Sequence, residues 1–234
     1  MAIMDNDYIV LQVRLRSTRL PNKALLPLAG VTIFEHILQR LILARLPKGI
    51  IVATTENTAP RIRDISKRYS TPILVGSEED VLSRYVACID KWAIKNVIRA
   101  TADNPLVSIE YIDRAIELHK IQNADLTLYP HLPYGTGVEV IKGNVLKKVA
   151  ALTNDPFERE HLTQYIYRHE AQYKIARGSP EPVFQRQELR LSVDTDEDYR
   201  RMDEIYRELY SGRPISLLDV INHIDKKDRK TRKK

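Results

Sequence analysis

Short apolar runs alternate with amphipathic stretches through the first half of the chain, which predicts strands and helices in turn. Phe34, Ile37, Leu38 and Leu41 fall on one stripe at a 3.6-residue period, typical of a helix with one buried face. The predicted strands are Tyr8–Val13, Gly49–Thr54, Pro72–Val75 and Asn96–Thr101, and the predicted helices are Ile33–Leu46, Ala59–Tyr69, Glu79–Ala93 and Ser108–Ile121. A repeated strand–helix order favours an α/β fold, with a mostly parallel sheet flanked by helices.

The pattern changes after Asp125. Short apolar segments are now separated by connections that contain proline and glycine, which indicates irregular β structure. We expect strands at Leu126–Tyr129, Val138–Lys142, Gln172–Ala176 and Leu189–Val193, and helices at Pro156–His169 and Asp196–Tyr210. The change predicts a small β-containing lobe, roughly residues 126–185, inserted over one edge of the sheet.

Length and composition fit one folded unit. Of 234 residues, 43% are hydrophobic and 29% are charged, which is ordinary for a globular protein, and we expect a single domain over residues 1–225. The lone cysteine, Cys88, excludes a disulfide framework and favours a reducing, cytoplasmic location. No apolar run is long enough to predict a membrane span, and residues 1–7 lack the features of a signal peptide.

The net charge of +6 belongs to the last residues of the chain. Residues 226–234 contain seven basic residues and one acidic residue, so the rest of the chain is balanced. A body that binds nucleic acid would carry its own basic excess, and we therefore expect no nucleic acid substrate. We interpret residues 226–234 as a basic, disordered tail, with contact to RNA or anionic lipid as the alternative.

The segment Gln12–Lys23, directly after the first predicted strand, concentrates charged side chains. It holds four cations and two hydroxyl groups around a proline. Ligands of open α/β sheets bind at the carboxyl ends of the strands. Guanidinium forks match phosphate oxygens, and a lysine adds a compact charge. The segment is therefore a candidate polyphosphate-binding loop, and a charged surface loop is the equal alternative.

Acidic residues follow two other predicted strands. Asp103 comes after Asn96–Thr101, and Asp194 and Asp196 come after Leu189–Val193. Mg²⁺ binds few carboxylates and completes its octahedron with water and phosphate oxygens, so these positions suit it. Taken singly, an Asx turn at Asp103 and helix capping at Asp194 and Asp196 explain them as well. Together with a cationic loop at the same sheet edge, they favour a metal site.

Signatures of several other classes are absent. The chain has no GxxxxGK[ST] phosphate loop, no complete GxGxxG and no HExxH. The fragment Gly135-Thr136-Gly137 fits a turn. His161 and His169 lack the spacing of metal ligands, which favours structural or surface roles for both.

Five collinear motifs resemble those of the cytidylyltransferase family of CMP-sugar-acid synthetases, and most closely its SpsF-like branch of spore coat polysaccharide biosynthesis. Gln12–Lys23 (QVRLRSTRLPNK) is similar to the family loop Q-A-R-x-x-S-T-R-L-P-x-K. The other four motifs are Gly76–Tyr85 (GSEEDVLSRY), Thr101–Leu106 (TADNPL), Phe157–Thr163 (FEREHLT) and Val193–Asp198 (VDTDED). The resemblance covers residues from about Tyr8 to about Tyr210.

The resemblance implies a Rossmann-like nucleotidyltransferase fold and a homodimeric enzyme of polysaccharide biosynthesis that uses CTP, Mg²⁺ and a small acceptor. Arg19 and Lys23 would be catalytic. The implied nucleotide-binding residues are Val13, Arg14, Ser17, Arg19, Lys23, Ser77, Asp80, Arg84 and Asp103. The implied metal ligands are Asp103 and Asp194, with Asp196 a further candidate at the same strand end. The implied acceptor-binding residues are Tyr134, Glu139, Glu158, Arg159 and His161.

The chain departs from the family pattern at three positions. The family usually has glycine where this chain has Arg16 and Asn22, and often where it has Ala102. Glycine lets the backbone approach phosphate closely, so Arg16 puts the loop's backbone contacts in question. The acceptor is open among sugar acids, amino sugars and phosphorylated or phosphonate compounds.

Two other functions compete with a CTP-dependent transferase. A glycosyltransferase of related architecture would use a preformed nucleotide-sugar and typically carries a D-x-D motif after a central strand, whereas Asp103 here precedes Asn104 and Pro105. A degenerate, non-catalytic family member would bind nucleotide only. Release of pyrophosphate from a nucleoside triphosphate would distinguish the CTP-dependent transferase from the glycosyltransferase. Turnover with any acceptor would distinguish it from the non-catalytic member.

Overall fold

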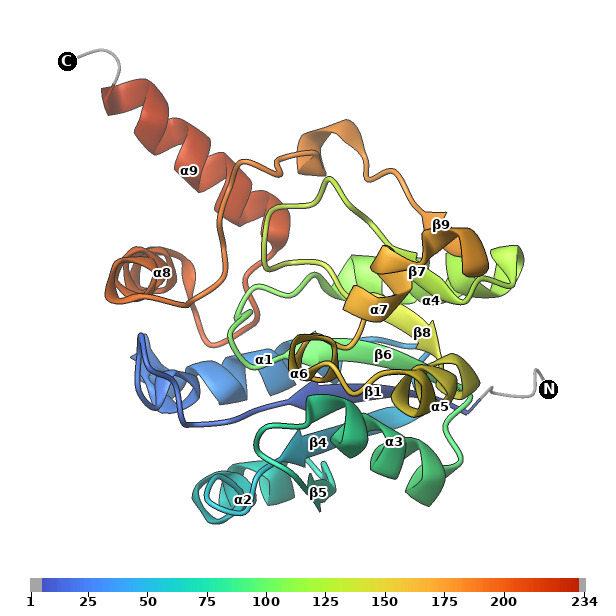
Figure 1. The fold of residues 1–234 in the computed structure, drawn as a ribbon. Coiled ribbons are helices and arrows are strands. Elements are labelled where there is room, and N and C mark those ends of the chain that lie inside the picture. Colours follow the sequence, from blue (N-terminus) through green and yellow to red (C-terminus); the bar gives the residue numbers. More distant parts are fainter. Residues whose placement is uncertain (1–5, 232–234) are drawn as a thin grey trace.

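A seven-stranded, mostly parallel sheet organises the computed structural model, which describes residues 6–231 and the side chains of residues 6–229. The strand order is β5-β4-β1-β6-β8-β7-β9 (Figure 1). Four parallel strands form one side of it: β1 (Asp7–Gln12), β4 (Gly49–Thr54), β5 (Ile73–Val75) and β6 (Asn96–Thr101). The α/β prediction is confirmed, because helices cover both faces of this parallel sheet and most side chains of β1, β4 and β6 are buried.

The predicted lobe differs from the structure in where its strands go. The strands β7 (Leu126–Leu128), β8 (Glu139–Lys142) and β9 (Ile175–Arg177) continue the main sheet beyond β6. The strand β8 runs antiparallel to both of its neighbours, and β9 runs parallel to β7. The unpaired edge of β6 is thereby satisfied by backbone hydrogen bonds, which a separate lobe would leave open.

The helices pack in two layers, one on each face of the sheet, where two apolar clusters form the core. Alternation along β1 sends Ile9 and Leu11 to one cluster and Val10 to the other. The first face is covered by α1 (Ile33–Leu41), α2 (Ala59–Arg68), α4 (Ile109–Gln122), α8 (Asp196–Leu209) and α9 (Leu217–Thr231). The second face is covered by α3 (Val81–Trp92), α5 (Gly143–Leu152) and α7 (Gln164–Arg168). The remaining short elements are the 3₁₀ turns η1 (Lys23–Leu25), η2 (Glu170–Gln172) and η3 (Pro182–Phe184), the hairpin β2 (Pro27–Leu28) and β3 (Val31–Thr32), and α6 (Pro156–Glu160).

Two predicted elements are wrong in detail. The helix expected over Pro156–His169 is split into α6 and α7, because His161 leaves helical geometry with φ −106° and ψ 71°. The strand expected at Leu189–Val193 is an extended segment with one isolated bridge, between Arg190 and Tyr134. Its backbone N–H groups donate hydrogen bonds to loops, and that of Val193 donates to the carbonyl of Asp103 at 2.8 Å. The segment therefore lies across the carboxyl edge of the sheet, outside it.

The basic segment at the end of the chain is helical as far as Thr231, contrary to the expectation of disorder over 226–234; residues 232–234 lie outside the described range. Ion pairs hold this part of α9 to the body. Asp225 accepts from Arg186 at 2.9 Å, and Lys227 contacts Glu204 at 2.7 Å and Glu208 at 2.6 Å. The basic side chains continue the helix because its apolar residues, such as Val220 and Ile221, already anchor it in the core. Among residues 6–231 no helix is long and apolar enough to cross a membrane.

Candidate active site

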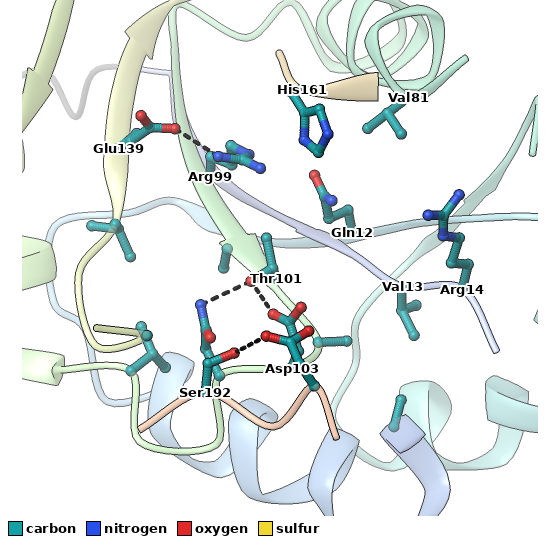
Figure 2. Close-up of a pocket in the computed structure, with 18 of the residues that line it drawn as sticks. Gln12, Val13, Arg14, Val81, Arg99, Thr101, Asp103, Glu139, His161 and Ser192 are labelled. Carbon is teal, nitrogen blue, oxygen red and sulfur yellow. Dashed lines mark hydrogen bonds and ion pairs between the residues drawn. The ribbon is translucent and has the colours of Figure 1, made fainter. Parts of the chain in front are cut away.

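A cavity of about 840 Å³ opens at the carboxyl ends of β1 and β6. Residues after β1, the end of β6, the loop after β7 and the extended segment before α8 supply its walls. Such a cleft forms where parallel strands end and their connections diverge, which is the usual ligand site of open α/β sheets. Figure 2 shows the side chains that point into it, with Gln12, Val13 and Arg14 on one side and Arg99, Thr101 and Asp103 on another.

Lys23 lies between two carboxylates at one end of this cavity, which we call the lysine end (Lys23, Asp103 and Asp194). Its Nζ donates to Asp103 Oδ2 at 3.1 Å, to Asp194 Oδ1 at 2.9 Å and to the carbonyl of Val193 at 3.0 Å. The two distances limit the separation of the carboxylate oxygens to about 6 Å. The structure thus brings together the two predicted carboxylates, which lie 91 positions apart in the chain.

Asp194 is held as an anion by several donors. Arg190 donates to Oδ2 at 2.5 Å, Ser192 donates to the same oxygen at 3.1 Å, and Arg19 reaches Oδ1 at 3.4 Å. Burial alone would raise the pKa of Asp194, but the hydrogen bond and the charge of Lys23 lower it below its ordinary value. The carboxylate is therefore charged at neutral pH.

The lysine end fits a divalent cation that arrives with a phosphate ligand. In residues 6–231 no group of three or more histidine, cysteine, aspartate or glutamate side chains could hold a metal by itself. Mg²⁺ typically binds through one or two carboxylates together with substrate phosphates, and the two carboxylates here offer that number. The cation of Lys23 already occupies the position between them, which shows that the geometry favours positive charge there.

Asp196 lies apart from this cluster. It is the exposed first residue of α8 and does not line the cavity. The helix is capped by Thr195 and Asp198, which form a capping box. We therefore leave Asp196 out of the candidate metal site.

The predicted nucleotide-binding residues divide into two groups. Those that line the cavity are Val13, Arg14, Ser17, Arg19, Lys23, Arg84 and Asp103. Ser77 and Asp80 lie behind the wall instead. The hydroxyl of Ser77 accepts from the backbone of Asp80 at 3.1 Å, and Asp80 caps α3. Arg84 donates to the carbonyl of Ser77, so both residues shape the loop that Glu78 and Glu79 present to the cavity.

The predicted acceptor-binding residues divide in the same way. Tyr134, Glu139 and His161 line the cavity. Glu158 is buried and accepts from Arg168 at 2.7 Å, outside the lining. Arg159 donates to Asp80 at 2.8 and 2.6 Å and so ties α6 to α3. These last two residues stabilise the wall without facing the cavity.

The side chains at Arg16, Asn22 and Ala102, where the family has glycine, cause little backbone strain. Of these three residues, Asn22 has a positive φ, 58°. Asparagine is among the residues that tolerate this region best after glycine. Its side chain accepts from Arg61 at 2.6 Å. Arg16 and Ala102 do not have positive φ, so a side chain is admissible at both. Arg16 is 86% exposed and approaches Glu78 at 4.0 Å across the cavity mouth.

Sequence reasoning missed several lining residues, of which Arg99 is the most buried cation. It lies within β6 and donates to Glu139, its register partner on β8, at 2.7 Å. The signal was a charged residue inside the apolar strand NVIRAT, a position that normally carries an apolar side chain. Glu160, which accepts from Arg14 at 2.6 Å, was also missed, because the helical expectation over Pro156–His169 did not indicate which residues face the cavity.

Comparison with known proteins identifies the family of the chain. A model of the cytidylyltransferase family matches residues 8–225. The spore coat polysaccharide biosynthesis protein SpsF of Bacillus subtilis is 28% identical over 230 residues, which cover 95% of this chain and 95% of that protein.

Solved structures agree. A cytidylyltransferase from Leptospira borgpetersenii matches with a TM-score of 0.89 and 26% identity over 96% of each chain. CMP:2-keto-3-deoxy-manno-octonic acid synthetase in complex with CTP matches with a TM-score of 0.67 and 15% identity, over 86% of this chain and 98% of that one. At 15% identity this second likeness concerns the fold.

Proposed function

The chain belongs to the cytidylyltransferase family, and we propose that it transfers CMP from CTP to an oxygen atom of a small, sugar-like acceptor and releases pyrophosphate. The acceptor is a sugar acid, an amino sugar or a phosphorylated or phosphonate compound. SpsF is named for polysaccharide biosynthesis, which supports a carbohydrate acceptor for this chain as well.

One observation carries the proposal: a lysine poised between two carboxylates, next to a loop rich in arginine. Lys23 contacts Asp103 and Asp194, and Arg19 lies beside Asp194. A nucleoside triphosphate brings both the negative charge that Lys23 and Arg19 can bind and the phosphate oxygens that complete a metal shell. A site for a neutral ligand would need neither feature.

In the proposed reaction the acceptor oxygen bonds to the α-phosphorus of CTP. The bond from that phosphorus to the oxygen bridging the α- and β-phosphates breaks, and pyrophosphate leaves with the electron pair while the acceptor proton is released. Arg19 and Lys23 bind the phosphates and stabilise the charge that develops on the leaving group. Asp103 and Asp194 would hold Mg²⁺, which when bound neutralises charge on the phosphate oxygens.

Binding requires Lys23 to exchange partners. In the free protein its ammonium is shared by the two carboxylates. Two carboxylates this close repel each other unless a cation lies between them, so Lys23 can turn toward phosphate only when another cation replaces it. Mg²⁺ and CTP should therefore bind together with higher affinity than either binds alone.

The test is pyrophosphate release from CTP with a panel of acceptors: a 2-keto sugar acid, an amino sugar and a phosphorylated polyol. UTP serves as the matched control, because it offers a carbonyl acceptor where cytosine offers an amine donor. Higher kcat/KM with CTP than with UTP supports cytidylyl transfer. Equal values for the two nucleotides would leave only a nucleotidyltransferase, and transfer from a preformed nucleotide-sugar without pyrophosphate would favour the glycosyltransferase alternative.

A further inference from the structure

Arg99 makes few hydrogen bonds for a buried guanidinium. Its side chain is 21% exposed and lines the cavity at the end away from Lys23. Within the described part of the chain it makes one hydrogen bond, from Nη1 to Glu139 Oε2 at 2.7 Å, and its buried Nε has no partner. A guanidinium carries five N–H donors, so most of the donor capacity of Arg99 is unused. Buried donors without partners are unfavourable and are usually satisfied by a ligand or by water.

Glu139, in contrast, has both of its oxygens occupied. Oε1 accepts from the hydroxyl of Tyr167 at 2.7 Å, and Oε2 accepts from Arg99 and from the hydroxyl of Thr163 at 3.3 Å. Burial and the charge of Glu139 raise the pKa of Tyr167, so that hydroxyl remains a donor. Arg99 and Glu139 line the cavity, and we call them, together with Tyr167, which contacts Glu139 from outside the lining, the arginine end. Its carboxylate is satisfied by the protein, and its guanidinium is not.

The position of Arg99 is rigid and well placed. Arg99 and Glu139 are direct partners on neighbouring antiparallel strands, so the pair is set by the register of β6 and β8. Arg99 and Thr101 lie on the same face of β6, which leads to Asp103 at the lysine end. Figure 2 shows Arg99 between Glu139 and His161, above the strand that ends at Thr101. Two residues of extended strand, from Arg99 to the end of β6 at Thr101, span about 7 Å, a distance that an arginine side chain and a monosaccharide-sized acceptor can cover together.

We propose that Arg99 is a specificity-determining residue that donates hydrogen bonds to a group of the acceptor carrying two oxygen atoms, and that Glu139 positions Arg99 without touching the acceptor. This rests on the proposed function, because it assigns the arginine end of the cavity to the acceptor. The fork of a guanidinium matches two oxygens held at a fixed spacing, as in a carboxylate or a pair of neighbouring hydroxyls. Glu139 balances the charge of Arg99 in the free protein, and Tyr167 holds Glu139 in place.

The kinetic test compares three substitutions with the best acceptor of the panel. R99K keeps the charge and removes the fork, and it should raise the acceptor KM by about 10-fold or more while the KM for CTP stays unchanged, the scale for one lost bidentate contact. Y167F leaves Arg99 and Glu139 in place but frees the carboxylate, and it should raise the acceptor KM by a smaller factor. R114K is the matched control, since Arg114 pairs with Glu181 at the same distance of 2.7 Å on the exposed surface. It should change neither KM.

A binding measurement gives a result even without turnover. In ¹⁵N-labelled protein with Mg²⁺ and α,β-methylene-CTP, the Nε–H resonance of Arg99 is assigned by its loss in R99K. A panel acceptor should shift this resonance and leave that of Arg114 unchanged. A 2-keto sugar acid and its neutral carboxamide distinguish the two sources of oxygen: a shift with the acid alone assigns a carboxylate, and a shift with both assigns hydroxyls.

The two proposals fail in different ways. Absence of CTP binding by the wild-type protein, measured by calorimetry, would overturn the proposed function. If CTP binds and an acceptor is turned over, but R99K keeps the wild-type acceptor KM, the proposed role of Arg99 is wrong and the proposed function still stands. The same holds if no panel acceptor shifts the Arg99 resonance.

Discussion

The two ends of the cavity use the same kinds of side chain in opposite ways. At the lysine end, Lys23 lies between Asp103 and Asp194 and contacts both, and Asp194 also pairs with Arg19 and Arg190. At the arginine end, one carboxylate receives several donors, and Arg99 keeps unused N–H groups. The first arrangement offers two carboxylates to a cation that replaces Lys23, and the second offers N–H donors to additional oxygen atoms. The comparison shows that the balance of donors and acceptors, more than the residue types, indicates what each end can bind.

The ends also differ in how they are held. Lys23 belongs to the 3₁₀ turn η1 after a loop, and its neighbour Arg19 is 66% exposed. Arg99 and Glu139 lie on two paired strands of the central sheet. Loops have more freedom to move than paired strands. The lysine end is thus suited to exchanging partners when a ligand binds, and the arginine end is suited to recognising a fixed shape.

The strongest test of the lysine end removes one carboxylate charge. Asp194→Asn and Asp103→Asn should each abolish detectable turnover, because a single carboxylate cannot hold both Lys23 and a metal in place. CTP binding through the arginine-rich loop should partly survive, as measured by calorimetry. Asp90→Asn, which alters an exposed pair with Lys147, is the control and should remain fully active. Full activity of either site variant, or full activity of the wild type in excess EDTA, would show that the lysine end holds no catalytic metal.

Removing the cations should have the next largest effect. Lys23→Ala and Arg19→Ala should each lower kcat/KM for CTP by about 100-fold or more, the scale for one group that stabilises developing charge. Circular dichroism should change little for Arg19→Ala, because that side chain is mostly exposed. Lys48→Ala, at an exposed lysine that contacts Asn6, provides the matched control. Near-wild-type activity of both variants would contradict the assignment of the triphosphate to this end.

Acid pH should destabilise the fold through a buried histidine that lies beside the arginine end. His119 on α4 contacts Thr127 at 2.9 Å and Asn96 at 3.2 Å, on strands beside the arginine end. Burial, followed by the charge of Lys142, lowers the pKa of His119 to about 4. The unfolded chain therefore binds this proton near its ordinary pKa of 6.5, and the folded chain only near 4.

The free energy of unfolding should accordingly fall as the pH is lowered from about 6.5 to about 4, by up to about 3 kcal/mol from this residue. Urea unfolding at a series of pH values measures it. His119→Gln should flatten the dependence, and His131→Gln, at an exposed position, should not. Asp194, whose pKa is lowered, should keep its charge over most of this range. An unchanged slope in His119→Gln would show that another group causes the acid instability.

The smallest effect is expected outside both ends. Deleting residues 226–234 removes Lys227, which contacts Glu204 and Glu208 on the surface of the protein. Exposed ion pairs contribute little, so the melting temperature should fall by no more than about 3 °C, and CTP affinity should not change. Lys227→Ala should reproduce most of the small decrease. A large loss of CTP affinity on truncation would show that this segment completes the nucleotide site.

Much of the fold could be predicted from local patterns, and the errors have local causes. The β–α order through Thr101 follows from hydrophobic periodicity, which depends on neighbouring side chains alone. The split between α6 and α7 was missed because Phe157–Thr163 has the polarity of a helix, and only the tertiary structure shows that His161 leaves helical geometry. The helical course of residues 226–231 was missed because a run of basic residues is typical of disorder, and the anchoring residues of α9 precede it.

The sequence by itself determined the four parallel strands, the family and the candidate residues of the lysine end, because these depend on periodicity and on motifs of adjacent residues. Only the tertiary structure decided that Lys23 meets carboxylates 80 and 171 positions away, and that Arg99 pairs with Glu139 across β6 and β8. It also decided that Glu158 and Arg159 turn away from the cavity while His161 faces it. Such outcomes depend on strand order and register, which are set by the packing of the whole core. A pattern along the chain does not contain them.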